Sequence, residues 1–240
     1  MITLILISLI FLAAGFTQGF SGFGSALLAM PLLTLFLDAK IAVPLSVLNS
    51  IIITSYLSLK LKNHMERKKI MPLVLGSLPG TYIGVKFLMY AESDIIKLFI
   101  GILIVSYCLY FLLIHSTPWR IHRLWAYPAG FCTGFIGSAF SAGGPPAIIY
   151  TSLTGWSKDQ IKATLTGFFF ISSILTAALQ ITSGLVTEEV FKYFTASAFS
   201  VLIGVYAGSR MYSRISRQAY LRIMLIMLII LGAIMIVSSL

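Results

Sequence analysis

The chain has 240 residues, of which 58% are hydrophobic and only 10% charged, and its mean hydropathy is +0.98. This composition excludes a soluble globular domain and leaves room for at most roughly ten membrane spans of about 20 apolar residues each. The net charge of +10 does not require a nucleic-acid partner, because basic residues gather in the cytoplasmic loops of membrane proteins. Two cysteines make neither a disulfide framework nor a metal-ligand spacing.

Ten apolar segments follow one another along the chain, and we expect each of them to be helical. They cover residues 2–19, 24–37, 41–59, 70–90, 95–114, 124–136, 145–153, 160–181, 190–209 and 218–238. The second, sixth and seventh segments are too short to cross a bilayer of about 30 Å comfortably at about 1.5 Å per residue. The pattern predicts an all-α polytopic membrane protein in which short helices form broken or re-entrant hairpins.

Two polar, glycine-rich breaks interrupt the apolar sequence about 120 residues apart. The first reads Phe20-Ser21-Gly22-Phe23-Gly24-Ser25, and the second reads Phe140-Ser141-Ala142-Gly143-Gly144-Pro145-Pro146. Irregular backbone is tolerated at membrane depth only where protein or a water-filled cavity covers it. Paired breaks in corresponding halves are typical of transporters whose solute binds near the bilayer midplane.

The basic residues predict the orientation of the chain. Loops 60–69, 154–162 and 209–222 and the central linker 115–123 hold 13 of the 17 Lys and Arg residues, so we expect all four to be cytoplasmic. Segment 124–153 must then begin and end on one side, as a hairpin does. Each half makes one hairpin and three crossings, which inverts the second half relative to the first and leaves both termini non-cytoplasmic.

We therefore expect a single membrane domain, 1–240, made of a first inverted repeat at 1–114 and a second at 124–240, joined by the linker. A second sequence similarity supports the repeat. The segments Gly80–Lys86 and Gly204–Arg210 both have the form G-x-Y-x-G-x-[KR]. The glycines themselves are expected to pack helices closely.

The breaks also predict a binding site. Each precedes a short helix, whose free N–H groups and positive dipole end attract an anion; a simple kink for helix packing is the alternative. The candidate solute-binding residues are Gln18, Ser21, Gly22, Gly24, Ser25, Thr133, Ser141, Gly143, Gly144 and Pro145. Gln18 and Thr133 flank the breaks at matching places. For the other intramembrane polar residues Asn49, Thr166 and Gln180, we expect hydrogen bonds between helices.

The ionisable residues exclude several function classes. All seven acids and all three histidines fall in or beside predicted loops. Cation carriers and proton relays usually need charges inside the membrane, and acid–base or metal enzymes need titratable groups or ligands in a pocket. An anion held by neutral donors remains, with no cofactor and no metal.

Two stretches resemble the TauE/SafE sulfite exporter family, and the resemblance covers essentially the whole chain. They are GFTQGFSGFGSALLAMP at 15–31 and GFCTGFIGSAFSAGGPPAII at 130–149. The family's glycine motifs fall on Gly19, Gly22, Gly24 and Pro31, and on Gly134, Gly137, Gly143, Gly144 and Pro145. Phe23 and Ser25 stand where the family commonly has glycines. The resemblance implies a small carrier of the bacterial inner membrane for sulfite, sulfonates, thiosulfate or related organic anions.

The sequence thus predicts a secondary transporter that moves a small anion by alternating access and is not an enzyme. Its expected partners are the anionic solute and the lipid bilayer, with no nucleic acid; a homodimer stays open. Two alternatives remain. One is a passive anion channel of the same architecture, and the other is a membrane-embedded enzyme or assembly scaffold.

Overall fold

The computed structural model describes residues 2–113 and 121–211, together with residues 229, 233, 236 and 237. The regular structure of these two stretches is entirely helical. Its elements are α1 (Ile2–Ser21), α2 (Ser25–Leu33), α3 (Ala39–Leu61), η1 (Lys62–His64), α4 (Arg67–Tyr90), α5 (Ser93–Leu113), η2 (Arg123–Trp125), α6 (Ala126–Phe140), α7 (Gly144–Ser152), α8 (Lys158–Thr182) and α9 (Glu188–Met211).

The nine α-helices described match the first nine predicted segments in order, so the all-helical prediction is confirmed there. The short segments are short helices: α2 and α7 have 9 residues each, and α6 has 15. Five described helices (α1, α3, α4, α8 and α9) are long and apolar enough to cross a membrane. The tenth predicted segment, 218–238, lies outside the described residues except for four positions.

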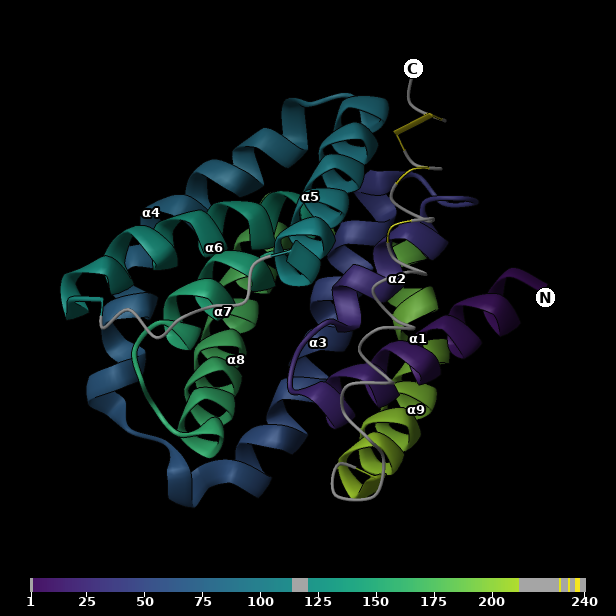
Figure 1. Ribbon diagram of the computed structural model, residues 1–240. Coiled ribbons are helices and arrows are strands. Elements are labelled where there is room, and N and C mark those ends of the chain that lie inside the picture. The colour runs from purple at the N-terminus through teal and green to yellow at the C-terminus, as the bar shows by residue number, and fades with distance from the viewer. Residues whose placement is uncertain (1, 114–120, 212–228, 230–232, 234–235, 238–240) are drawn as a thin grey trace.

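The helices form two tightly packed pairs with a pair of central helices between them (Figure 1). α1 packs along α9, and α4 packs along α6. α3 packs against α8, and each of them also packs mainly against one helix of an outer pair, α3 against α9 and α8 against α4. The first helix of each predicted half therefore lies against the fourth helix of the other half.

Glycines allow the backbones of α1 and α9 to touch. A Cβ atom added to Gly15 would lie 2.6 Å from the carbonyl oxygen of Val201, and one added to Gly208 would lie 2.1 Å from that of Phe16. Real Cβ atoms do not approach so closely, because such distances are well inside van der Waals contact. The contact is reciprocal, since glycines on both helices face the partner's backbone.

The pair formed by α4 and α6 uses the same contact. A Cβ on Gly80 would lie 2.2 Å from the carbonyl oxygen of Phe131, and one on Gly130 would lie 2.2 Å from that of Leu73. Small residues spaced four apart let membrane helices approach closely in this way. The expected packing role of the two G-x-Y-x-G motifs is confirmed, because Gly80 and Gly84 pack on α6 as Gly204 and Gly208 pack on α1.

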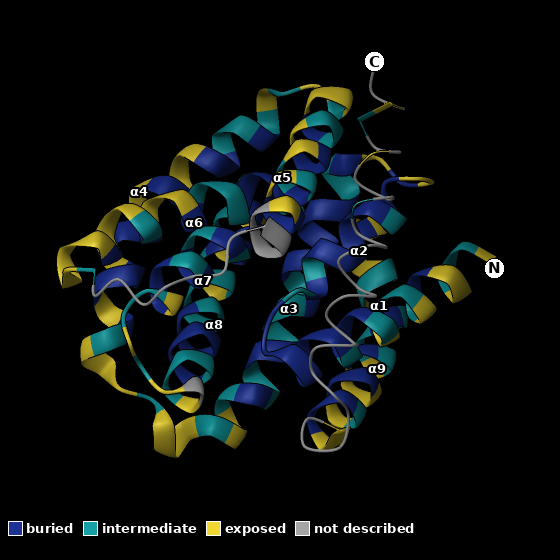
Figure 2. Ribbon diagram, in the orientation of Figure 1, coloured by how far each residue is buried: buried dark blue, intermediate teal, exposed yellow. Residues whose placement is uncertain are grey.

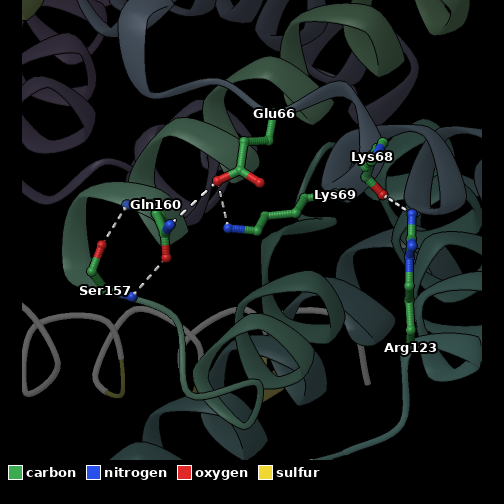
Figure 3. A network of polar contacts seen from close by, with 6 residues as sticks. All are labelled: Glu66, Lys68, Lys69, Arg123, Ser157 and Gln160. Atoms are coloured by element: carbon green, nitrogen blue, oxygen red, sulfur yellow. Dashed lines mark hydrogen bonds and ion pairs between the residues drawn. The ribbon is translucent and has the colours of Figure 1, made fainter.

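Polar contacts join the beginnings of α4 and α8 (Figure 3). The carboxylate of Glu66 forms an ion pair with Lys69 at 2.7 Å and accepts a hydrogen bond from the side-chain amide of Gln160 at 3.2 Å. Gln160 also completes a capping box with Ser157 at the start of α8. Lys69 lies over the ring of Trp156, 5.0 Å from its centroid. Loops 60–69 and 154–162 are thereby held together.

The other two basic loops meet this cluster. The guanidinium of Arg123 donates to the carbonyl of Lys68 (Figure 3), and the amine of Lys60 donates to the carbonyl of Ser209 at 3.2 Å. The described parts of all four basic loops thus gather at one end of the bundle, which we call the basic end. This clustering agrees with the prediction that the four basic loops lie on the same side of the membrane.

The segment predicted to be a hairpin in the second half closes on itself. The backbone N–H of Ile121, just before η2, donates to the carbonyl of Leu153, just after α7, at 3.3 Å. α6 leaves the basic end beside α4, and α7 returns to it. Segment 124–153 therefore begins and ends at the same end of the bundle, as predicted.

Exposed residues lie on the outer faces of the helices and buried residues face the middle of the bundle (Figure 2), and many large apolar side chains are exposed while several polar ones are buried. Exposed side chains such as Phe199 and Tyr90 leave apolar surface facing outward. Inside, the amide of Asn49 donates to Ser197 at 3.0 Å, and that of Gln180 donates to the Ser138 carbonyl at 3.3 Å. These two expected interhelical bonds are confirmed. The prediction for Thr166 is wrong, because its buried hydroxyl has no partner in the described part.

We expect Gly80→Ala to destabilise the protein by about 1–3 kcal/mol, because the added methyl group overpacks a backbone contact. Gly208→Ala should have an effect of similar size, since it meets an equally close carbonyl. Thermal unfolding of the detergent-solubilised protein measures both. Leu78→Ala is the control, because Leu78 lies on α4 with 44% of its surface exposed. Equal unfolding temperatures for Gly80→Ala and the wild type would contradict the packing argument.

Candidate functional site

A cavity of about 90 Å³ lies between the two breaks. A water molecule needs about 10–15 Å³ on this measure, so the cavity holds roughly six to nine water-sized groups. Its wall is built by the end of α1, the starts of α2 and α7, the middle of α6, and one face each of α3 and α8. Both breaks and both central helices thus enclose one space.

Seven of the ten predicted site residues line this cavity. They are Gln18, Gly24, Ser25, Thr133, Ser141, Gly143 and Gly144. The structure therefore brings together residues from both halves that lie more than 100 positions apart in the chain.

The other three predicted residues do not line the cavity. Ser21 is the last residue of α1, and its hydroxyl donates to the Thr17 carbonyl at 2.7 Å. Gly22 has a φ of 89° and faces Lys162, whose Cγ would lie 3.0 Å from an added Cβ. Pro145 is buried in the first turn of α7. Their part in solute binding stays a prediction.

The first break ends in a helix start that opens into the cavity. Gly24 precedes α2 with a φ of 95°, in the left-handed region that glycine adopts without steric cost. Ser25, Ala26 and Leu27, the first three residues of α2, all line the cavity. Their N–H groups have no partner within the helix, because the first bond inside it runs from the Leu28 N–H to the Gly24 carbonyl at 3.2 Å. Three backbone donors therefore lie at the cavity wall.

The second break packs more tightly against its own hairpin. A Cβ on Gly143 would lie 2.5 Å from the carbonyl oxygen of Thr133 and 2.7 Å from the Cα of Gly137. Ser141 takes a φ of 58°, which is uncommon for a residue other than glycine. Gly144 is open by comparison, since an added Cβ would meet only the end of the Ile148 side chain, at 3.3 Å.

Two polar side chains from the first helices of the hairpins face this space. Gln18 is 5% exposed, and its side-chain oxygen accepts the hydroxyl of Ser25, which leaves its NH₂ group as a donor without a partner in the described part. Thr133 is 2% exposed, and its hydroxyl likewise has no partner among the described residues. Unsatisfied buried polar atoms are uncommon in native structures and call for an explanation.

Hydroxyl groups on the central helices complete the wall, and the sequence reasoning missed them. Ser50 and Thr54 come from α3, and Ser172, Ser173 and Thr176 come from α8. A sequence pattern that recurs in both halves could have identified these residues. The spacing S-x-x-x-T occurs at 50–54 and again at 172–176, and residues four apart share one face of a helix.

Within the described chain, the cavity wall contains no ionisable side chain. All seven acids are described, and each is exposed at or just before the start of a helix, where a negative charge complements the helix dipole. Lys162 lies at the edge of the first break, where its amine donates to the Gly19 carbonyl at 3.4 Å. The cavity therefore offers neutral donors and hydroxyls.

Comparison with known proteins assigns the chain to a family. A model of the family described as "Sulfite exporter TauE/SafE" matches residues 7–235, and the chain belongs to that family. It is 27% identical over 164 residues to "Probable membrane transporter protein YfcA" of Escherichia coli strains K12, O6:H1 and O157:H7. The match covers 65% of this chain but only 58% of those relatives. No solved structure matches the chain.

We expect Thr133→Val to leave the free energy of unfolding unchanged or to raise it by up to about 3 kcal/mol. An unsatisfied buried hydroxyl costs about 1–3 kcal/mol, and valine has nearly the same shape. The matched control is Thr151→Val, because the buried Thr151 hydroxyl donates to the Ala147 carbonyl at 2.9 Å. That variant should lose about 1 kcal/mol. Thermal unfolding without solute compares them, and a larger loss for Thr133→Val would show that its hydroxyl is satisfied.

Proposed function

We propose that this protein is a secondary transporter that moves a small anion, such as sulfite, thiosulfate or a sulfonate, by alternating access. The observation that carries the proposal is the cavity, which both breaks line and whose described wall is neutral. Backbone N–H groups at helix starts and side-chain donors recognise anions without a full positive charge. Family membership supports the transporter class, and the family's description supports an oxyanion of sulfur as the solute.

Two further features support alternating access by inverted repeats, 1–114 and 124–240. The second hairpin returns to the basic end, at Leu153. The first returns to the opposite end, where the amine of Lys40 donates to the carbonyl of Met89, near the end of α4, at 3.1 Å. Hairpins that open in opposite directions are expected of inverted repeats, which rock around a fixed site in many carriers.

A passive anion channel of the same architecture is the alternative. A carrier must show saturable exchange of labelled solute between the two sides of a proteoliposome, whereas a channel gives a conductance that rises linearly with voltage. A membrane-embedded enzyme receives less support, because acid–base or metal chemistry requires titratable or ligating groups at the site. The described cavity wall has none.

We expect thermal stabilisation of the purified protein by at least one of sulfite, sulfate, thiosulfate, sulfoacetate and taurine. Gly144→Asp should then weaken binding of that solute about tenfold or more, because like charges repel by about 2 kcal/mol even when they lie about 8 Å apart, at an effective dielectric constant of about 20. Gly144 suits the test, since a side chain fits there and its backbone needs no left-handed φ.

Gly144→Asn is the matched control, because it adds nearly the same bulk without the charge. Weak binding by Gly144→Asp together with near-normal binding by Gly144→Asn supports an anion in this cavity. Equal binding by Gly144→Asp and the wild type would place the solute elsewhere. No stabilisation of the wild type by any of the five solutes would remove the support for this solute class.

We expect an inner-membrane protein with the basic end cytoplasmic and both termini outside, because 13 of the 17 Lys and Arg residues lie in the four basic loops. Reporter enzymes fused to the C-terminus and inserted in loop 60–69 measure this in cells. The loop reporter should be active only in the cytoplasm, and the C-terminal reporter only outside it. A cytoplasmic C-terminus would contradict both this orientation and the inverted repeat.

A further inference from the structure

The two helix starts at the cavity are not equivalent. α2 opens with Ser25, Ala26 and Leu27, and each of these residues has a backbone N–H. α7 opens with Gly144, Pro145 and Pro146, and proline has no N–H to donate. The first turn of α7 therefore supplies one backbone donor where that of α2 supplies three.

Side chains add to the difference. Gln18 is more than nine-tenths buried, and its oxygen is held by the hydroxyl of Ser25 in the first turn of α2. Its NH₂ group, without a partner in the described part, is therefore kept beside the three N–H groups of α2. Beyond the helix dipole, the buried Thr133 hydroxyl lines the same cavity and has no partner among the described residues, and such an unsatisfied donor indicates a ligand with acceptor oxygens.

At the break before α7, the backbone is occupied by packing. Gly143 lies against the Thr133 carbonyl and against Gly137, so this break is braced by its own hairpin. The remaining wall carries the hydroxyls of α3 and α8. Hydroxyls both donate and accept, and they suit an uncharged polar part of a solute as well as they suit an anion.

We propose that the solute's charged group binds at the start of α2, against the N–H groups of Ser25, Ala26 and Leu27 and the amide of Gln18. The rest of the solute extends toward the hydroxyls of α3 and α8, and the start of α7 shapes the cavity without holding the charge. The site therefore takes solutes with one anionic group and favours them over solutes with an anionic group at each end. This inference rests on the proposed anion-transport function.

Ala26→Pro tests it by removing one N–H from the first turn of α2, where proline is tolerated. Ala26→Val is the matched control, because it adds comparable bulk and keeps the N–H. The affinity of the solute identified in the stabilisation screen is measured by titration calorimetry, after thermal unfolding without solute has shown that both variants are folded. We expect Ala26→Pro to bind at least about fivefold more weakly than Ala26→Val.

A second variant keeps the test decisive if Ala26→Pro does not fold. Gln18→Met removes the amide donor and keeps the length of the side chain, and we expect it to bind about tenfold more weakly than the wild type. Pro146→Ala adds a backbone N–H to α7, and it should change affinity less than twofold.

The outcomes separate this inference from the proposed function. If the wild type binds none of the anions, the function itself is wrong. The inference alone is wrong if the wild type binds but Ala26→Pro matches Ala26→Val, or Gln18→Met matches the wild type. A rise of fivefold or more in Pro146→Ala would also overturn it, because the charge would then lie at α7.

Discussion

The structure depends on one constraint, which is that a helix interrupted at membrane depth leaves backbone N–H groups that lipid cannot satisfy. Both interruptions are covered by protein. α3 and α8 lie across the breaks, and the pairs α1–α9 and α4–α6 hold the two hairpins against the rest of the bundle. Glycine makes these pairs close enough, because any Cβ at Gly80 or Gly208 would overlap a carbonyl oxygen. The helix starts at both breaks thus line one small cavity.

Most of the fold could be predicted from the sequence, and the reason is the strong contrast between apolar spans and polar breaks. The helices α1 to α9 begin and end within about four residues of the predicted segments, and the basic loops meet at one end. The cavity was predicted less completely. The sequence predicts that Ser21 lies in the break and binds the solute, but Ser21 is the last residue of α1 and its hydroxyl bonds the backbone of Thr17 and Phe23 and does not line the cavity. A shift of one or two residues at a helix end decides which way a side chain points, and composition does not reveal it.

The missed part of the site has a different cause. Ser50, Thr54, Ser172 and Thr176 lie in long apolar helices that were treated as plain crossings. A serine or threonine inside such a helix can return its hydroxyl to a backbone carbonyl of the preceding turn, and Thr54 does so, donating to the Ser50 carbonyl at 2.6 Å. The presence of a serine or threonine in an apolar helix therefore does not by itself identify a residue of the cavity wall. What marks these is the matching spacing in both halves, combined with the position of α3 and α8 across the breaks.

The two halves resemble each other most where their helices pack and least at the helix starts that line the cavity. The glycine spacing is the same in α4 and α9, and also in α1 and α6, because every one of these helices must admit a partner's backbone. The helix starts at the cavity do not need to admit a partner's backbone, and their sequences differ. The first reads Gly-Ser-Ala-Leu at 24–27, and the second reads Gly-Gly-Pro-Pro at 143–146. Similar helix packing in the two halves therefore surrounds a cavity whose two helix starts differ. An asymmetric solute binds better to such a site than to a symmetric one, because each end of the molecule meets its own chemistry.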